Sequence, residues 1–168
     1  MWARRVQDRL VTAHIFRRFC AFSAFRNDFW RTPLSLPSII ITQQDADRLE
    51  AILERLSEQS FPGKERLEVE LDRATIVGSH EVPADIVTMN STVLFRTGEG
   101  KEFSLKLVYP KDSDGSPDKI SILAPIGSAL LGLKEGDTIS WPVNGGASMD
   151  VQVIRVMEQP ERDGNFAL

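Results

Sequence analysis

The residues that most constrain the fold run from Ile120 to Gly136 and read ISILAPIGSALLGLKEG. Alternating apolar residues at the start of this stretch predict a short strand. Pro125 suits the first position of a helix, because its missing N–H would have no helical partner there, and Gly132 is typical of the left-handed residue that ends one. Gly127 and Ser128 are small enough to let backbones approach closely. The stretch carries no obvious chemistry, so it predicts a packing element around which a small sheet folds.

The composition predicts an ordinary globular protein. Of the 168 residues, 42% are hydrophobic and 26% are charged, which is typical of one domain or two small ones. The single cysteine, Cys20, excludes an internal disulfide framework and a cysteine-based zinc site, and it fits a reducing compartment. No stretch approaches the roughly 18 consecutive apolar residues that a membrane span needs. We therefore expect a cytoplasmic protein without a membrane partner.

Residues 1–38 differ in composition from the rest of the chain. They hold seven arginines, no lysine and two aspartates, a net charge of +5, whereas the other residues hold 13 basic and 22 acidic side chains, a net charge of −9. One interpretation is a helix on a membrane surface or a targeting sequence. We favour the other interpretation, in which this extension lies upstream of the true translation start, near Leu34, and is disordered or loosely helical.

The acidic charge of the remaining residues limits the kind of partner. Binding to duplex DNA relies on a Lys- and Arg-rich surface that displaces counterions, so we expect no direct sequence-specific contact with nucleic acid. An acidic surface is instead suited to docking on a basic surface of another protein.

A helical hairpin is predicted over residues 39–78. Thr42 followed by Asp45 resembles a capping box and indicates a helix start. Two helices, 43–59 and 64–77, are then predicted by apolar residues at 3- and 4-residue spacing: Leu49, Ile52, Leu53 and Leu56 in the first, and Leu67, Leu71, Ala74 and Val77 in the second. Paired antiparallel, they would bury both stripes and form a short coiled-coil finger, because neither is stable alone at this length. A helix of about 17 residues would reach about 25 Å.

The tip of this finger would carry Glu58, Phe61 and Glu65. Two carboxylates seven residues apart could in principle hold a metal ion, but a proper oxygen cage needs more ligands. We favour a solvated turn and expect no bound metal.

Residues 79–85 are polar and include a proline, so we expect a linker there. Residues 86–168 are predicted to form a mostly β domain with one short helix. The expected strands are 93–96, 103–109, 120–123, 138–143 and 148–157, and Asn144-Gly145-Gly146 is a strong hairpin turn between the last two.

The chain shows no pattern that is typical of catalysis. It has no Gly-rich phosphate loop, no histidine pair, and no serine or cysteine with a matching base nearby. Asp112, Asp114 and Asp118 resemble a calcium loop, but Leu123 stands where the bidentate glutamate should be, so we interpret this segment as a plain loop. We expect no catalytic residue and no cofactor.

Several motifs in order resemble the bacterial family of regulators of nucleoside diphosphate kinase (Rnk). They are the helical hairpin, VTMNSTV at 87–93, LVYP at 107–110, APIGSALLGLKEGD at 124–137 and the hairpin around residues 144–146. The motif at 124–137 is also similar to the C-terminal domain of the transcript-cleavage factors GreA and GreB. The resemblance covers residues 39–168, and residues 1–38 have no counterpart in it.

This resemblance implies an α+β fold, with an N-terminal antiparallel two-helix coiled coil and an FKBP-like antiparallel sheet domain. It implies a non-enzymatic regulator that binds RNA polymerase near the secondary channel, where it would compete with Gre factors and affect nucleoside diphosphate kinase levels. Separately, we expect the protein to be a monomer. The contact residues that it implies are the tip residues Glu58, Phe61 and Glu65, and a surface formed by Pro125, Gly127, Ser128, Leu131 and Gly132.

Three alternatives stay open. Gre factors hold a catalytic magnesium through an acidic D-x-x-E pattern at the finger tip, whereas Glu58 to Glu65 reads EQSFPGKE here. Transcript cleavage through Glu58 and Glu65 is therefore a weaker hypothesis, and so is prolyl isomerase activity, because fold alone does not carry function. Direct contact with nucleoside diphosphate kinase is neither supported nor excluded by the sequence.

Overall fold

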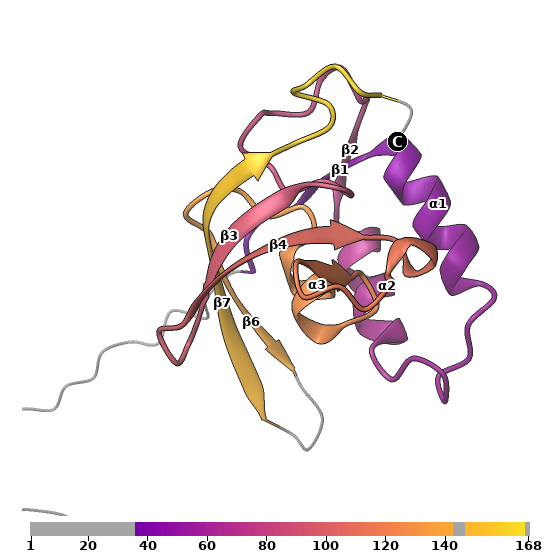
Figure 1. The fold of residues 1–168 in the computed structure, drawn as a ribbon. Coiled ribbons are helices and arrows are strands. Elements are labelled where there is room, and N and C mark those ends of the chain that lie inside the picture. The colour runs from indigo at the N-terminus through magenta and orange to yellow at the C-terminus, as the bar shows by residue number, and fades with distance from the viewer. Residues whose placement is uncertain (1–35, 143–146, 167–168) are drawn as a thin grey trace, which may run out of the picture. The chain divides into compact units, whose positions relative to one another are not determined.

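A five-stranded sheet organises the α+β fold that the computed structural model describes for residues 36–142 and 147–166 (Figure 1). The strand order is β5-β4-β3-β7-β6. The strands are β3 (Thr92–Thr97), β4 (Glu102–Val108), β5 (Lys119–Ser121), β6 (Thr138–Pro142) and β7 (Ser148–Glu158). The described residues also form four helical segments: α1 (Gln43–Leu53), α2 (Lys64–Asp72), the 3-10 turn η1 (Pro110–Asp112) and α3 (Pro125–Leu130).

The predicted strands and the short helix are confirmed to within about two residues, but the sheet is not wholly antiparallel. Strand β5 pairs parallel with β4, since η1 and the loop after it carry the chain back before β5 begins. The predicted turn at residues 144–146 lies outside the described residues, although the β6–β7 pairing that it predicts is present. Most of residues 1–38 also lie outside them.

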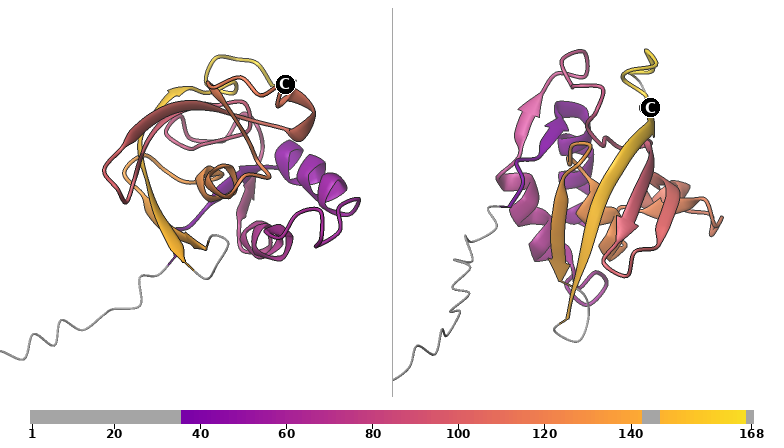
Figure 2. Two further views of the ribbon diagram at one scale, coloured as in Figure 1. Left: turned by 60° about the horizontal axis from the view of Figure 1, so that its bottom comes forward. Right: turned by 90° about the vertical axis from the view of Figure 1, so that its left-hand side faces the viewer.

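Helix α3 lies inside the curve of the sheet, as the left view of Figure 2 shows. Pro125 is its first residue, and Gly132, with φ of 75°, follows its end, as predicted. The backbone N–H of Gly132 donates to the Val87 carbonyl, and its carbonyl accepts from the N–H of Ile40. A side chain at Gly132 would meet Ile39, so glycine lets the N-terminal strand cross close to the end of α3.

Helices α1 and α2 lie alongside the sheet and α3 and do not project from them as a separate finger (Figure 2). Their apolar stripes join one hydrophobic core with the β domain, including Leu49, Leu53 and Leu67 from the helices and Phe95 and Leu107 from the sheet. The prediction of a protruding coiled coil is therefore wrong. The apolar faces are buried in a core shared with the body, and this packing stabilises two helices that are too short to be stable alone.

Both helices are shorter than predicted. Helix α1 ends at Leu53 after 11 residues, and α2 ends at Asp72 after nine. Residues 75–77, expected as helix, form strand β2 (Thr75–Val77), which pairs parallel with β1 (Ile40–Thr42). All three residues of β2 are β-branched, which favours an extended backbone once a partner strand is available.

Candidate protein-docking site

Two regions that the sequence analysis singled out separately lie around one cavity of about 340 Å³. One is the tip loop, residues 54–63 between α1 and α2, and the other is the start of α3. Phe61 and Arg66 line the cavity from the first region, Pro125 and Ser128 from α3, and Trp141 from β6. We call these five residues the tip–α3 site. Two regions of the chain that are about 60 positions apart thus form one concave surface.

The tip loop is held by its own hydrogen bonds. The backbone N–H groups of Ser60 and Phe61 donate to the Ser57 carbonyl, and the Lys64 ammonium donates to the Leu56 carbonyl at 3.0 Å. Phe61 turns inward and is only 6% exposed. The loop is therefore not a freely solvated turn, because burial of its aromatic residue fixes it to the body.

Arg66 connects α2 to the sheet. Its guanidinium lies 5.3 Å from the ring centroid of the buried Trp141 and forms an ion pair of 2.9 Å with Glu70. Glu70 also accepts from Arg73, whose guanidinium donates to the Pro37 carbonyl at 2.6 Å. This arrangement places a basic group and an aromatic ring in the wall of the site, a combination that is common at protein interfaces.

The structure divides the eight predicted contact residues into two groups. Glu58, Glu65 and Pro125 are exposed and can contact a partner. The other five are buried: Phe61, Gly127, Ser128, Leu131 and Gly132. Phe61 and Ser128 still line the cavity. The other three serve internal packing, so the prediction that they form a docking surface is wrong.

Ser128 and Gly127 show why this part of α3 is internal. The Ser128 hydroxyl donates to the Ile122 carbonyl at 2.6 Å. A Cβ atom at Gly127 would overlap the carbonyl oxygen of Ser121. Both residues hold the helix against the chain that leaves β5, which is the close backbone approach that the sequence predicted.

Two further features, a metal cluster and a membrane-spanning helix, are absent from the described part of the chain. Among the described residues, no group of three or more His, Cys, Asp or Glu side chains could hold a metal ion. No helix in the described part of the chain is long and apolar enough to cross a bilayer. Glu58 and Glu65 are exposed on the tip loop and the first turn of α2.

A buried polar cluster fixes α1 to the β domain, and the sequence analysis did not find it. Thr42 caps α1 by accepting from the Asp45 N–H, as predicted, but the Asp45 carboxylate bonds elsewhere. It accepts from the Tyr109 hydroxyl at 2.7 Å and from the Met89 N–H at 3.1 Å. Burial, and then the charge of Asp45, raise the pKa of Tyr109, so this hydroxyl remains a donor.

The C-terminal segment joins the same cluster. The Thr88 hydroxyl donates to the Glu161 carboxylate at 2.7 Å. The buried amide of Gln159 donates to the carbonyls of Pro83 and Ile86 at 2.9 and 2.8 Å, which ties the end of β7 to the predicted linker. Only the polar character of these residues was visible in the sequence, because their partners are 73 or more positions away.

Replacing Glu161 by glutamine is expected to flatten the pH dependence of stability in the mildly acidic range. Burial raises the pKa of Glu161 above its ordinary value of 4.5. The native state then binds more protons than the unfolded state, so the stability from protonated Glu161 is complete below pH 4.5 and is lost as the pH rises through the native pKa. Urea unfolding at a series of pH values measures this slope. A Glu161→Gln variant with the wild-type slope would contradict the assignment.

Comparison with known families matches both halves of the described chain. Residues 37–77 match the family described as the Rnk N-terminus. Residues 82–158 match the family described as the C-terminal part of the transcription elongation factors GreA and GreB. The boundary between the two matches falls between β2 and Ile86, where the structure has a loop.

Individual relatives agree with this assignment. A GreA from Leuconostoc mesenteroides is 33% identical over 87 residues, which are 51% of this chain and 54% of that protein. A solved structure described as a prokaryotic GreA/GreB elongation factor from Nitrosomonas europaea is 54% identical, with a TM-score of 0.59, and covers 73% of this chain and 99% of that one. The regulator of nucleoside diphosphate kinase of Escherichia coli K12 is 40% identical over 136 residues, which are 80% of this chain and all of that protein. The chain therefore belongs to the Rnk family of regulators, related to the GreA and GreB elongation factors.

Proposed function

We propose that this protein is a non-catalytic transcription regulator that binds RNA polymerase near its secondary channel. In this proposal it acts as a cytoplasmic monomer and competes with Gre factors for the polymerase, with linked effects on nucleoside diphosphate kinase levels. The observation that carries the proposal is the match of residues 82–158 to the C-terminal part of the Gre factors. A domain shared with another factor is a reason to expect a shared docking surface.

The fold changes how such competition would work. An α1 of 11 residues is about 16 Å long and is packed against the body. It does not supply a long prong that could fill a channel. We therefore propose that competition comes from occupying the docking surface for the Gre factors, with the tip–α3 site and the exposed Glu58, Glu65 and Pro125 in contact with the polymerase.

The charge of the tip gives a direct test of this docking surface. The double variant Glu58→Lys and Glu65→Lys is expected to bind core RNA polymerase several-fold more weakly than the wild type, because it places like charge against a basic partner surface. The control is Glu99→Lys, which changes the net charge by half as much and whose exposed side chain lies in the β3–β4 turn, on the side of the sheet away from the tip loop (Figure 1). Binding is measured on immobilised polymerase at physiological salt.

The possible outcomes separate the function from the site. If the wild type does not bind core polymerase, the proposed function is wrong. If the double variant binds as well as the wild type, the polymerase contacts another face and the assignment of the tip–α3 site is wrong. If Glu99→Lys weakens binding to core polymerase as much as the double variant does, the loss comes from net charge and not from contacts at the tip, and the assignment of the site is wrong.

Neither enzymatic alternative is favoured by an observation in the structure. Transcript cleavage through Glu58 and Glu65 would require these carboxylates to be held together around a metal, and no group of three or more metal-ligating side chains is present among the described residues. A cleavage assay on stalled complexes with magnesium would detect this activity. Glu58→Ala should leave the result unchanged.

A further inference from the structure

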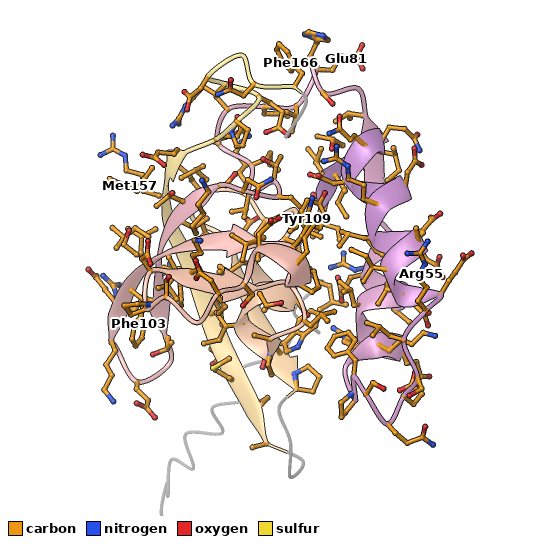
Figure 3. The ribbon with its side chains drawn as sticks, turned by 45° about the vertical axis from the view of Figure 1, so that its right-hand side comes forward. Arg55, Glu81, Phe103, Tyr109, Met157 and Phe166 are labelled. Carbon is orange, nitrogen blue, oxygen red and sulfur yellow. The ribbon has the colours of Figure 1, made fainter. Side chains whose placement is uncertain are left out.

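A second cavity, of about 800 Å³, shares no lining residue with the tip–α3 site. It lies between α1, β4, η1 and β5, and its volume is in the range of small-molecule sites. Apolar groups form much of its wall, including Ile52 from α1, Val108 from β4 and Pro110 from η1. Tyr109, labelled in Figure 3, also lines it.

Basic side chains gather around this apolar wall. Four of the lining residues are basic and one is acidic: Arg48, Lys106, Lys111, Lys119 and Asp112. This excess of positive charge contrasts with the net charge of −9 on residues 39–168. The Arg48 guanidinium lies 5.8 Å from the ring centroid of Tyr109, so charge and aromatic surface occur side by side.

Two of these lysines occupy paired positions on neighbouring strands. Lys106 of β4 and Lys119 of β5 are partners in the parallel register, and both line the cavity. Like charges at such positions repel each other. Lys119 is compensated by an ion pair of 2.7 Å with Asp114, whereas Lys106 has no ion pair among the described residues. An anion bound in the cavity would compensate Lys106 and reduce the repulsion.

We propose that this cavity binds a small phosphorylated molecule with a flat apolar body. Its phosphate groups would be held by Lys106, Lys111 and Lys119, whose ammonium groups bind phosphate as point charges. Its flat part would lie against the apolar wall near Tyr109 and Ile52. A concave site with an apolar wall and a few charged groups suits such a ligand better than a purely ionic one.

The test uses ATP as the probe, titrated into the full chain by isothermal calorimetry. Adenosine and tripolyphosphate serve as its separate halves, and each is expected to bind at least about tenfold more weakly than ATP, because each uses only part of the site. Lys106→Gln is expected to weaken ATP binding about tenfold through loss of a charge-assisted contact. The control is Lys101→Gln in the β3–β4 turn, where Lys101 pairs with Glu99.

Several outcomes would overturn the proposal. These are no ATP binding at millimolar concentration, equal effects of Lys106→Gln and Lys101→Gln, or tripolyphosphate binding as tightly as ATP. Binding of polyglutamate without binding of ATP would also overturn it and would favour an acidic protein segment. Lys111→Gln provides a second variant in an exposed turn, so a folding defect of Lys106→Gln would not leave the question open.

Discussion

The Asp45→Ala variant is expected to lose about 3 kcal/mol of unfolding free energy, because two buried donors lose their acceptor at once. Asp45 is 3% exposed, and its two carboxylate oxygens accept from the Tyr109 hydroxyl and the Met89 N–H. Alanine would leave both groups unpaired in the core. Because these donors belong to the β domain, the substitution should also weaken the attachment of α1. Urea unfolding followed by circular dichroism measures the loss.

A double-mutant cycle makes this prediction specific. Tyr109→Phe alone should cost about 1–2 kcal/mol, and the double variant should cost less than the sum of the two, because both partners of one bond are then absent. Asp47→Ala is the matched control, since Asp47 is exposed on the same helix, and it should change stability by no more than about 0.5 kcal/mol. Additive effects of Asp45→Ala and Tyr109→Phe would contradict the coupling.

The Gly127→Ala variant is expected to lose at least about 2 kcal/mol, although alanine is the better helix former. Its Cβ atom would overlap the Ser121 carbonyl oxygen and lie 3.2 Å from the Ile122 Cα. Both neighbours are backbone atoms and cannot rotate away, so α3 would have to move off the sheet. Thermal or urea unfolding of the purified variant checks this result.

Gly98→Ala is the control for this substitution. A Cβ atom there would lie 3.5 Å from the Cβ of Asp150, an ordinary contact. We expect a change within about 1 kcal/mol, in either direction, because alanine also restricts the unfolded chain. If Gly127→Ala were as stable as Gly98→Ala, the close packing of α3 on the end of β5 would not hold.

The segment from Ile120 to Gly136 was predictable because its signals are local. Pro125 and Gly132 fix the two ends of α3 through their own backbone preferences, which need no distant partner. The strands of the β domain were likewise visible in alternating residues and turn glycines. The family resemblance was visible for the same reason, since its motifs are continuous in the sequence.

The features that the sequence did not predict depend on distant partners. The strand Thr75–Val77 exists because Ile40–Thr42 lies beside it, and the apolar pattern of the preceding helix hid this change. Phe61 was expected on a solvated turn, but it is 6% exposed and lines one cavity with Trp141 and Pro125. The charged cavity around Lys106 combines residues from four elements, so its basic side chains come together only in the fold.

The candidate docking site was therefore predicted only in part. Glu58, Glu65 and Pro125 were correctly expected at the surface, but that they contact a partner stays a prediction. Gly127 and Gly132 were chosen because small residues permit close approach. The structure shows that the approaching groups belong to the same chain. A small residue in a sequence indicates that another group packs closely against the backbone there. It does not indicate whether that group belongs to a partner or to the same chain.

Displacement of a fluorescently labelled GreA from core RNA polymerase tests the central claim most directly. We predict that the wild-type protein displaces GreA in a concentration-dependent manner and stimulates no transcript cleavage while doing so. Simultaneous binding of both proteins, with the GreA signal unchanged at saturating concentrations of this protein, would contradict the account.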